Sequence, residues 1–157
     1  MDSNHILINI RKILRSVNLE SKRIQKEYGI SIPQLLTLNF LKSCEDYKAS
    51  QREISGHLNL NASTVTGIIS RLEKKGYVAK LPNAKDKRVT NVALTTAGAG
   101  LLNKAPELMH DQLQAKLNKL SREQLLEIER GFELLIEVMG IGDVDAFPVI
   151  TIDDMSA

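Results

Sequence analysis

The stretch of sequence that decides the fold runs from Ser50 to Thr96 and reads SQREISGHLNLNASTVTGIISRLEKKGYVAKLPNAKDKRVTNVALTT. Ser50 is followed three residues later by Glu53, the capping-box spacing that begins a helix. A turn at 59–61 separates this helix from a second one, for which Asn61 is a good N-cap. Two short helices joined by a tight turn predict a helix–turn–helix.

The second helix of this unit has two chemically different faces. Val65, Ile69 and Leu72 recur at i, i+4 and i+7, so one apolar stripe faces a core. The opposite face carries short residues that let another molecule approach closely, as a recognition helix in a DNA major groove requires. These residues are Ser63, Thr64, Thr66, Gly67 and Ser70. A merely solvated helix face is the alternative interpretation.

A basic hairpin is predicted after this helix. We expect a strand at Tyr77–Leu81, a turn at 82–87 and a return strand at Arg88–Leu94. Seven basic residues and two acidic ones give the segment 71–88 a net charge of +5, in a chain whose total is +2. Charge concentrated in this way suits nucleic-acid phosphates. The whole stretch therefore predicts a winged helix–turn–helix.

Four ordered motifs extend this prediction to a family. They are Ser63–Thr66, Arg71–Val78, Asp86–Arg88 and Leu94–Gly98. In order and spacing they resemble the MarR-type (multiple-antibiotic-resistance regulator) transcriptional regulators, and the helical pattern agrees from about residue 4 to 139. The resemblance implies a mainly α winged helix–turn–helix, with six helices and a two-stranded wing between the fourth and fifth helices.

The same resemblance implies roles for residues of the wing. Arg88 is expected to enter the minor groove while Asp86 holds its guanidinium group; a plain surface salt bridge is the alternative. Lys85 and Lys87 are expected to contact phosphates, or else only to solubilise the surface. The full expected DNA-binding set is Ser63, Thr64, Thr66, Gly67, Ser70, Arg71, Lys85, Asp86, Lys87 and Arg88.

Long helices are predicted on both sides of this centre. One covers 4–27 and is ended by Gly29; another runs from Thr95 to about Asn118, with a kink at Pro106; the last covers 121–139. We expect one domain. Its parts are a DNA-binding lobe at 31–98, dimerisation helices at 4–27 and 99–139, and a tail at 140–157.

Both terminal helices carry apolar residues on two faces, which indicates one face for the chain's own core and one for a partner. In the MarR-type family these helices interlock as a twofold dimer. The residues expected to meet across the axis are Ile6, Ile10, Ile13, Leu135, Ile136 and Met139. A wide face buried within one subunit is the alternative. Nine acidic residues against two arginines give 121–157 a net charge of −7, so this end should lie away from DNA.

Other classes of function find little support in the sequence. The chain has one cysteine, Cys44, which we interpret as a small apolar residue and not as a redox sensor. Its three histidines are scattered, without metal-ligand spacing or a catalytic constellation. We therefore expect no enzyme activity, no metal and no cofactor. No apolar segment approaches spanning length, so a cytoplasmic protein is expected.

The resemblance implies a dimeric repressor that binds a pseudo-palindromic operator in double-stranded DNA. A small molecule or the ionic conditions would shift the spacing of the two recognition helices. The segments Ile10–Ser21, Tyr28–Gly29 and Pro33–Leu36 look like the branch that controls compatible-solute (ectoine-type) operons. The rival from another class is a helical protein-interaction adaptor that uses a winged fold without DNA.

Overall fold

The computed structural model describes residues 2–83, 85–86, 88–105 and 107–144. These residues form two compact units, one covering 2–105 and the other 107–144. The expected mainly α fold with a small antiparallel sheet is confirmed. Lys87 and the segment 145–157, with its apolar run Phe147–Ile152, lie outside the described residues.

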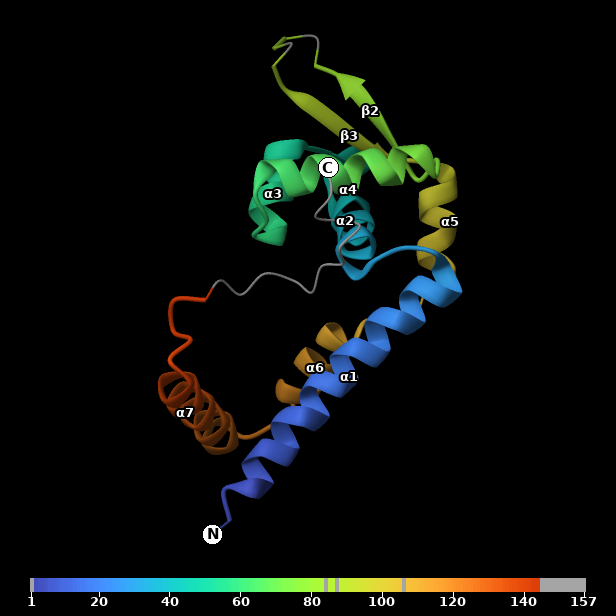
Figure 1. The fold of residues 1–157 in the computed structure, drawn as a ribbon. Coiled ribbons are helices and arrows are strands. Elements are labelled where there is room, and N and C mark those ends of the chain that lie inside the picture. The colour runs from blue at the N-terminus through green and yellow to red at the C-terminus, as the bar shows by residue number, and fades with distance from the viewer. Residues whose placement is uncertain (1, 84, 87, 106, 145–157) are drawn as a thin grey trace. The chain divides into compact units, whose positions relative to one another are not determined.

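The first unit begins with α1 (Asn4–Tyr28), as the apolar periodicity predicted. The helix ends because Gly29 adopts a left-handed conformation (φ 68°) and donates its N–H to Gln25 O at 3.0 Å. Ile24 is the buried residue of α1. Figure 1 shows this long helix meeting the rest of the unit only at its carboxyl end.

A compact lobe, residues 30–104, makes up the rest of the first unit and is called the winged lobe below. It starts with α2 (Ile32–Ser43), whose N-cap Ser31 accepts a hydrogen bond from Gln34 N at 3.3 Å. A 3-10 turn, η1 (Glu45–Tyr47), and a short strand, β1 (Lys48–Ser50), follow. Neither was predicted from sequence, because three residues are too few to show a periodicity.

The helix–turn–helix consists of α3 (Gln51–Leu58) and α4 (Ala62–Lys74). Both predicted caps are present: Ser50 accepts from Glu53 N at 3.1 Å, and Asn61 accepts from Thr64 N at 2.9 Å. Asn59 closes α3 in the left-handed conformation (φ 55°), which asparagine tolerates better than most residues. Local capping therefore fixes both helix starts.

The wing is a hairpin of β2 (Val78–Pro82) and β3 (Thr90–Leu94), which in Figure 1 projects beyond α4. β3 is the central strand of the sheet, in the order β1-β3-β2, and Ala49 of β1 pairs with Val92. The predicted start of the return strand at Arg88 is wrong, because Asp86 and Val89 close a turn: Val89 N donates to Asp86 O at 3.1 Å.

The core of the lobe is formed by α2, β1, α3, α4, β2 and β3. Its buried apolar residues are Ile30, Ile32, Leu35, Leu38, Leu41, Ala49, Ile54, Leu58, Leu60, Val65, Ile68, Ile69, Leu72, Val78 and Val92. The last helix of the lobe, α5 (Thr96–Lys104), is capped by Thr95 and lies so close to the wing that a Cβ at Gly98 would collide with Tyr77 O. Thr95 Oγ1 also donates to Gly76 O at 2.6 Å. The base of the wing is thereby fixed to the lobe.

The predicted single helix from Thr95 to Asn118 is wrong. It is broken into α5 and α6 (Met109–Leu117), with Ala105 in an extended conformation (φ −70°, ψ 140°). Ala105 precedes Pro106, and a residue before proline is sterically disfavoured in the helical region. The proline therefore ends the helix instead of kinking it.

The second unit contains α6 and α7 (Arg122–Met139). A reciprocal capping box starts α7: Gln124 N donates to Ser121 Oγ at 3.2 Å and Ser121 N to Gln124 Oε1 at 3.0 Å. Gly140 ends it with φ 66°. No residue of α7 is buried. Within the described part of the chain, no helix is long and apolar enough to span a membrane.

Candidate nucleic-acid interface

The amino-terminal half of α4 presents most of the small polar residues predicted for a recognition helix. Ser63 and Thr66 are exposed, whereas Thr64, Ser70 and Arg71 are partly exposed. Gly67 was also predicted to lie on this outer face, but it is buried. Position 67 lies about 200° around the helix from Val65, so the apolar stripe of α4 does not account for its burial.

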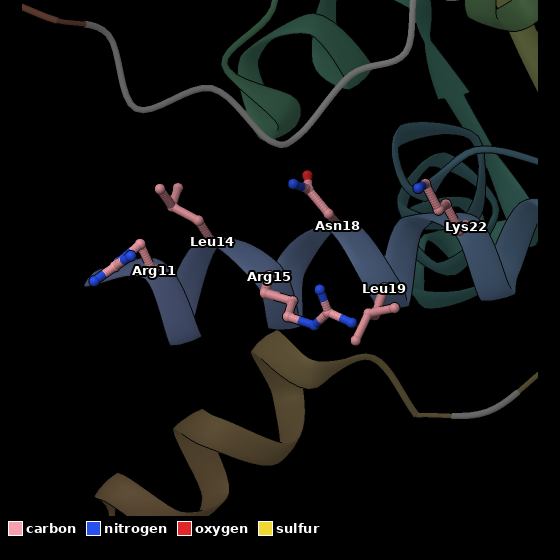
Figure 2. A pocket seen from close by; sticks show the side chains of 6 residues that line it. All are labelled: Arg11, Leu14, Arg15, Asn18, Leu19 and Lys22. Carbon is pink, nitrogen blue, oxygen red and sulfur yellow. The ribbon is translucent and has the colours of Figure 1, made fainter. Parts of the chain in front are cut away.

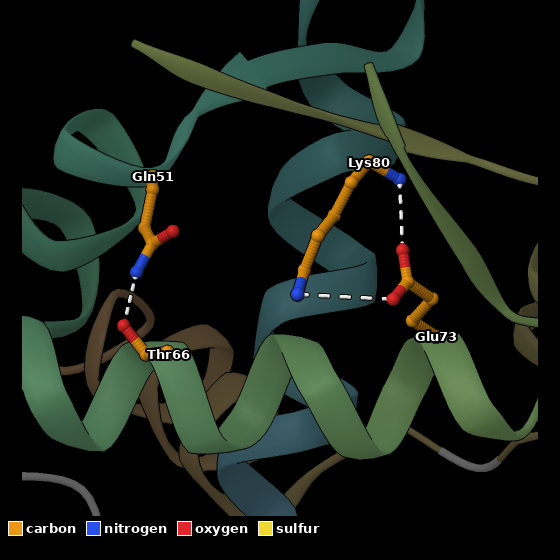
Figure 3. Close-up of polar contacts among 4 residues, drawn as sticks. All are labelled: Gln51, Thr66, Glu73 and Lys80. Atoms are coloured by element: carbon orange, nitrogen blue, oxygen red, sulfur yellow. Dashed lines mark hydrogen bonds and ion pairs between the residues drawn. The ribbon is translucent and has the colours of Figure 1, made fainter. Parts of the chain in front are cut away.

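Two of these hydroxyl groups bond within the lobe. Ser63 Oγ donates to Asn61 Oδ1 at 3.0 Å, and Thr66 Oγ1 donates to Ala62 O at 2.8 Å. Gln51 Nε2 donates to Thr66 Oγ1 across the helix pair, as Figure 3 shows. Since its one hydroxyl proton is already donated, the Thr66 hydroxyl has no proton left to donate to a bound molecule.

Gln51 was not predicted as a site residue. It is the first residue of α3, and only the packing of α3 against α4 brings it to Thr66. By contrast, the side chains of Thr64 and Ser70 make no hydrogen bond to any part of the chain that the structure describes. Their hydroxyls therefore remain available as donors to a bound molecule.

The base of the wing is tied to the end of α4 by Glu73 and Lys80. Lys80 Nζ lies 3.7 Å from Glu73 Oε1, and Lys80 N donates to Glu73 Oε2 at 3.3 Å (Figure 3). Both side chains are about two-fifths exposed, so the ion pair contributes at most about 1 kcal/mol to stability. Its effect is to orient β2 relative to the recognition helix.

The wing tip is shaped by side chains that accept hydrogen bonds from the backbone. Asn83 Oδ1 accepts from Lys85 N at 2.9 Å, and Asp86 Oδ1 accepts from Arg88 N at 3.0 Å. Asp86 was expected to hold the guanidinium group of Arg88. Within the described residues the two side chains form no ion pair, and Asp86 instead orients the Arg88 backbone. Lys85, Asp86 and Arg88 are exposed.

The basic surface is smaller than the sequence count suggested. Lys80 lies beside Glu73, and the ammonium group of Lys75 lies against the carbonyl oxygen of Gly29. The exposed cations of this surface that remain among the described residues are Lys74, Lys85 and Arg88, with Arg71 partly exposed. The structure therefore concentrates positive charge on the end of α4 and the tip of the wing.

The terminal helices present a different kind of surface. Among the residues predicted for dimerisation, Ile6, Ile13, Ile136 and Met139 are 40–51% exposed, and Ile10 and Leu135 are partly exposed. On another side of α1, a shallow hollow is lined by Arg11, Leu14, Arg15, Asn18, Leu19 and Lys22, whose side chains Figure 2 shows. Three cations beside two leucines suit an acidic, partly apolar partner.

A helix–turn–helix followed by a basic hairpin, on a lobe with its own core, defines a winged helix–turn–helix protein. Residues 30–90 match the MarR family. The winged region of the chain is therefore similar to this family of transcriptional regulators.

Known proteins share both sequence and fold with the chain. It is 28% identical over 114 residues to the HTH-type transcriptional repressor IacR of Pseudomonas putida, covering 73% of this chain and 67% of IacR. It is also 28% identical over 127 residues to the multiple antibiotic resistance protein MarR of Escherichia coli, covering 78% and 88% of the two chains. The fold is similar to that in the crystal structure of an S. aureus MepR–DNA complex (TM-score 0.64, 20% identity, 88% of this chain and 98% of MepR).

Proposed function

We propose that the protein is a homodimeric repressor that binds a pseudo-palindromic operator in double-stranded DNA. The observation that carries the proposal is the shared surface of α4 and the wing, where available hydroxyls stand beside exposed cations. In support, IacR is named a repressor, and MepR has been crystallised in complex with DNA.

In this proposal α4 enters the major groove, with Thr64 and Ser70 facing base edges and Lys85 and Lys87 close to phosphates. Arg88 enters the neighbouring minor groove, and Asp86 presents it by fixing its backbone. Two copies related by a twofold axis would place their recognition helices about 34 Å apart, one turn of DNA.

The terminal helices support the dimer. Eight large apolar side chains along α7 are 38–77% exposed, and no residue of this helix is buried, although such surface is unfavourable in water. The two helices also have opposite charge: six basic and two acidic residues give α1 a net +4, and two basic and five acidic ones give α7 a net −3. We propose that both helices form the interface, with Ile6, Ile10, Ile13, Leu135, Ile136 and Met139 at its centre.

Regulation in this proposal is a population shift. A small molecule, or a change in ionic conditions, would favour dimers whose recognition helices no longer match the operator spacing. The likeness of the first helix to regulators of compatible-solute operons makes genes of salt adaptation the first targets to test.

Binding to random and to selected duplex DNA, measured at several salt concentrations, tests the proposal. Six to ten phosphate contacts should lower the affinity about 10³–10⁵-fold between 50 and 200 mM salt. Genomic fragments recovered with the protein should share a pseudo-palindrome and identify the regulated genes. Affinity independent of salt, or one monomer per site, contradicts the proposal; an adaptor without DNA binding would show no retention at low salt.

A further inference from the structure

Lys75 ends the recognition helix, yet its side chain points away from the proposed DNA surface. Its Nζ donates to the carbonyl oxygen of Gly29 and lies 3.5 Å from Oε1 of Gln34. Gly29 ends α1, and Gln34 lies in the first turn of α2. One ammonium group therefore joins the end of α4 to the junction between α1 and α2.

The Lys75 site suits a cation for two reasons. The last carbonyl groups of α1 carry the negative end of the helix dipole, and the Gly29 carbonyl directly follows them. Gln34 is only 3% exposed, so its side-chain oxygen is held in place by the surrounding protein. A lysine with a long, flexible stem reaches both acceptors from the neighbouring helix end.

The α1–α2 junction is the place where α1 can pivot relative to the lobe. Ile30 is fully buried and holds the chain after the junction to the core, whereas Ile24 is the only residue of α1 that is buried. Between them lies Gly29, which has no side chain and a left-handed backbone. Because a carbonyl oxygen turns with its peptide plane, a bond to Gly29 O fixes the ψ angle of this pivot.

We propose that Lys75 is a positioning residue that locks the angle between α1 and the recognition helix, and so sets the operator spacing that the dimer accepts. The inference rests on the proposed function, because only a DNA-binding dimer reads that angle. Both Lys75 and the neighbouring Lys74 are exposed, but Lys75 donates to Gly29 O whereas Lys74 belongs to the basic surface.

The test compares Lys75→Met with Lys74→Met, which remove one ammonium group each from adjacent positions and keep the apolar stem. Without DNA, we expect Lys75→Met alone to accelerate hydrogen exchange of the Gly29 amide, which donates to Gln25 O. With DNA, Lys75→Met should weaken the preference for the native half-site spacing over a spacing longer by one base pair, by roughly 2- to 30-fold. Lys75→Arg, which retains a cation, should restore that preference.

The dependence of affinity on salt distinguishes positioning from a phosphate contact. A lysine that contacts phosphate in both protomers contributes about 1.8 to the slope of log affinity against log salt. Lys75→Met should leave the slope unchanged, whereas Lys74→Met should reduce it. A slope reduced by Lys75→Met with unchanged amide exchange would make Lys75 a phosphate contact and overturn the inference.

Failure of the proposed function gives a different result. If the parent protein binds no DNA, the repressor proposal is wrong, and the exchange of the Gly29 amide still decides whether Lys75 holds the junction. If that exchange is the same in the parent and in Lys75→Met, the inference is wrong whatever the DNA measurements show.

Discussion

The winged lobe and the two terminal helices differ in where their apolar side chains lie. Apart from Ile24 and Leu108, every buried apolar residue in the described part of the chain belongs to the lobe. Along α1 and α7, by contrast, thirteen large apolar side chains are exposed. The lobe can therefore fold around its own core, whereas the terminal helices leave apolar side chains exposed, which the proposed dimer would cover. This difference predicts that substitutions in the two regions have separable effects on folding, assembly and DNA binding.

The largest effect should come from a charge in the apolar surface of α7. Ile136→Asp would place an unpaired carboxylate in the proposed interface twice per dimer, at roughly 3–5 kcal/mol per copy, which is at least about 100-fold in the dimer dissociation constant. Sedimentation velocity measures the change. Val138→Asp is the matched control, because it lies about 200° around the helix and is 77% exposed. If Ile136→Asp dimerises as strongly as the parent, α7 does not form part of the interface.

A cavity in the core of the lobe should have a nearly equal effect, but on the free energy of unfolding. Leu72 is fully buried, so Leu72→Ala should lower the free energy of unfolding by about 2–5 kcal/mol. Leu81→Ala in β2, where the side chain is 37% exposed, should cost less than about 1 kcal/mol. Urea unfolding followed by circular dichroism compares the two. A similar loss for both variants would mean that the lobe does not possess the separate core described above.

Substitutions in the wing should weaken DNA binding without changing dimerisation. Arg88→Ala should weaken operator binding by about 1–3 kcal/mol without changing the dimer. Asp86→Ala should produce part of this loss, because it frees the Arg88 backbone. Arg122→Ala, which removes the same charge from the start of α7, is the control. Fluorescence anisotropy at physiological salt measures the affinities, and parental binding by Arg88→Ala would refute the role of the wing.

The smallest effect separates the two kinds of hydroxyl on α4. Thr66 Oγ1 bonds to Ala62 and Gln51, so Thr66→Val should lower the unfolding free energy by about 1 kcal/mol and change operator affinity little. Ser70→Ala should lower the operator affinity and change the unfolding free energy little, since the Ser70 hydroxyl has no partner within the described residues. Thermal unfolding and operator titration of both variants supply the comparison. A larger loss of affinity for Thr66→Val than for Ser70→Ala would reverse the assignment.

The sequence by itself determined the elements whose signals are local. Ser50 and Asn61 cap their helices as predicted, and Gly29 ends the first helix, because a cap involves residues no more than a few positions apart. The apolar stripe of α4 was also correctly assigned to the core. The break after α5 also has a local cause, because Pro106 follows that helix. Its effect was predicted to be only a kink.

Only the tertiary structure decided which site residues are available and what they contact. The bond between Gln51 and Thr66 and the turn of Lys75 toward Gly29 both depend on neighbouring helices. The strand β1 exists because Ala49 pairs with Val92, more than forty residues away. Such contacts follow from how packed elements meet in space, and periodicity along one segment carries no information about that meeting.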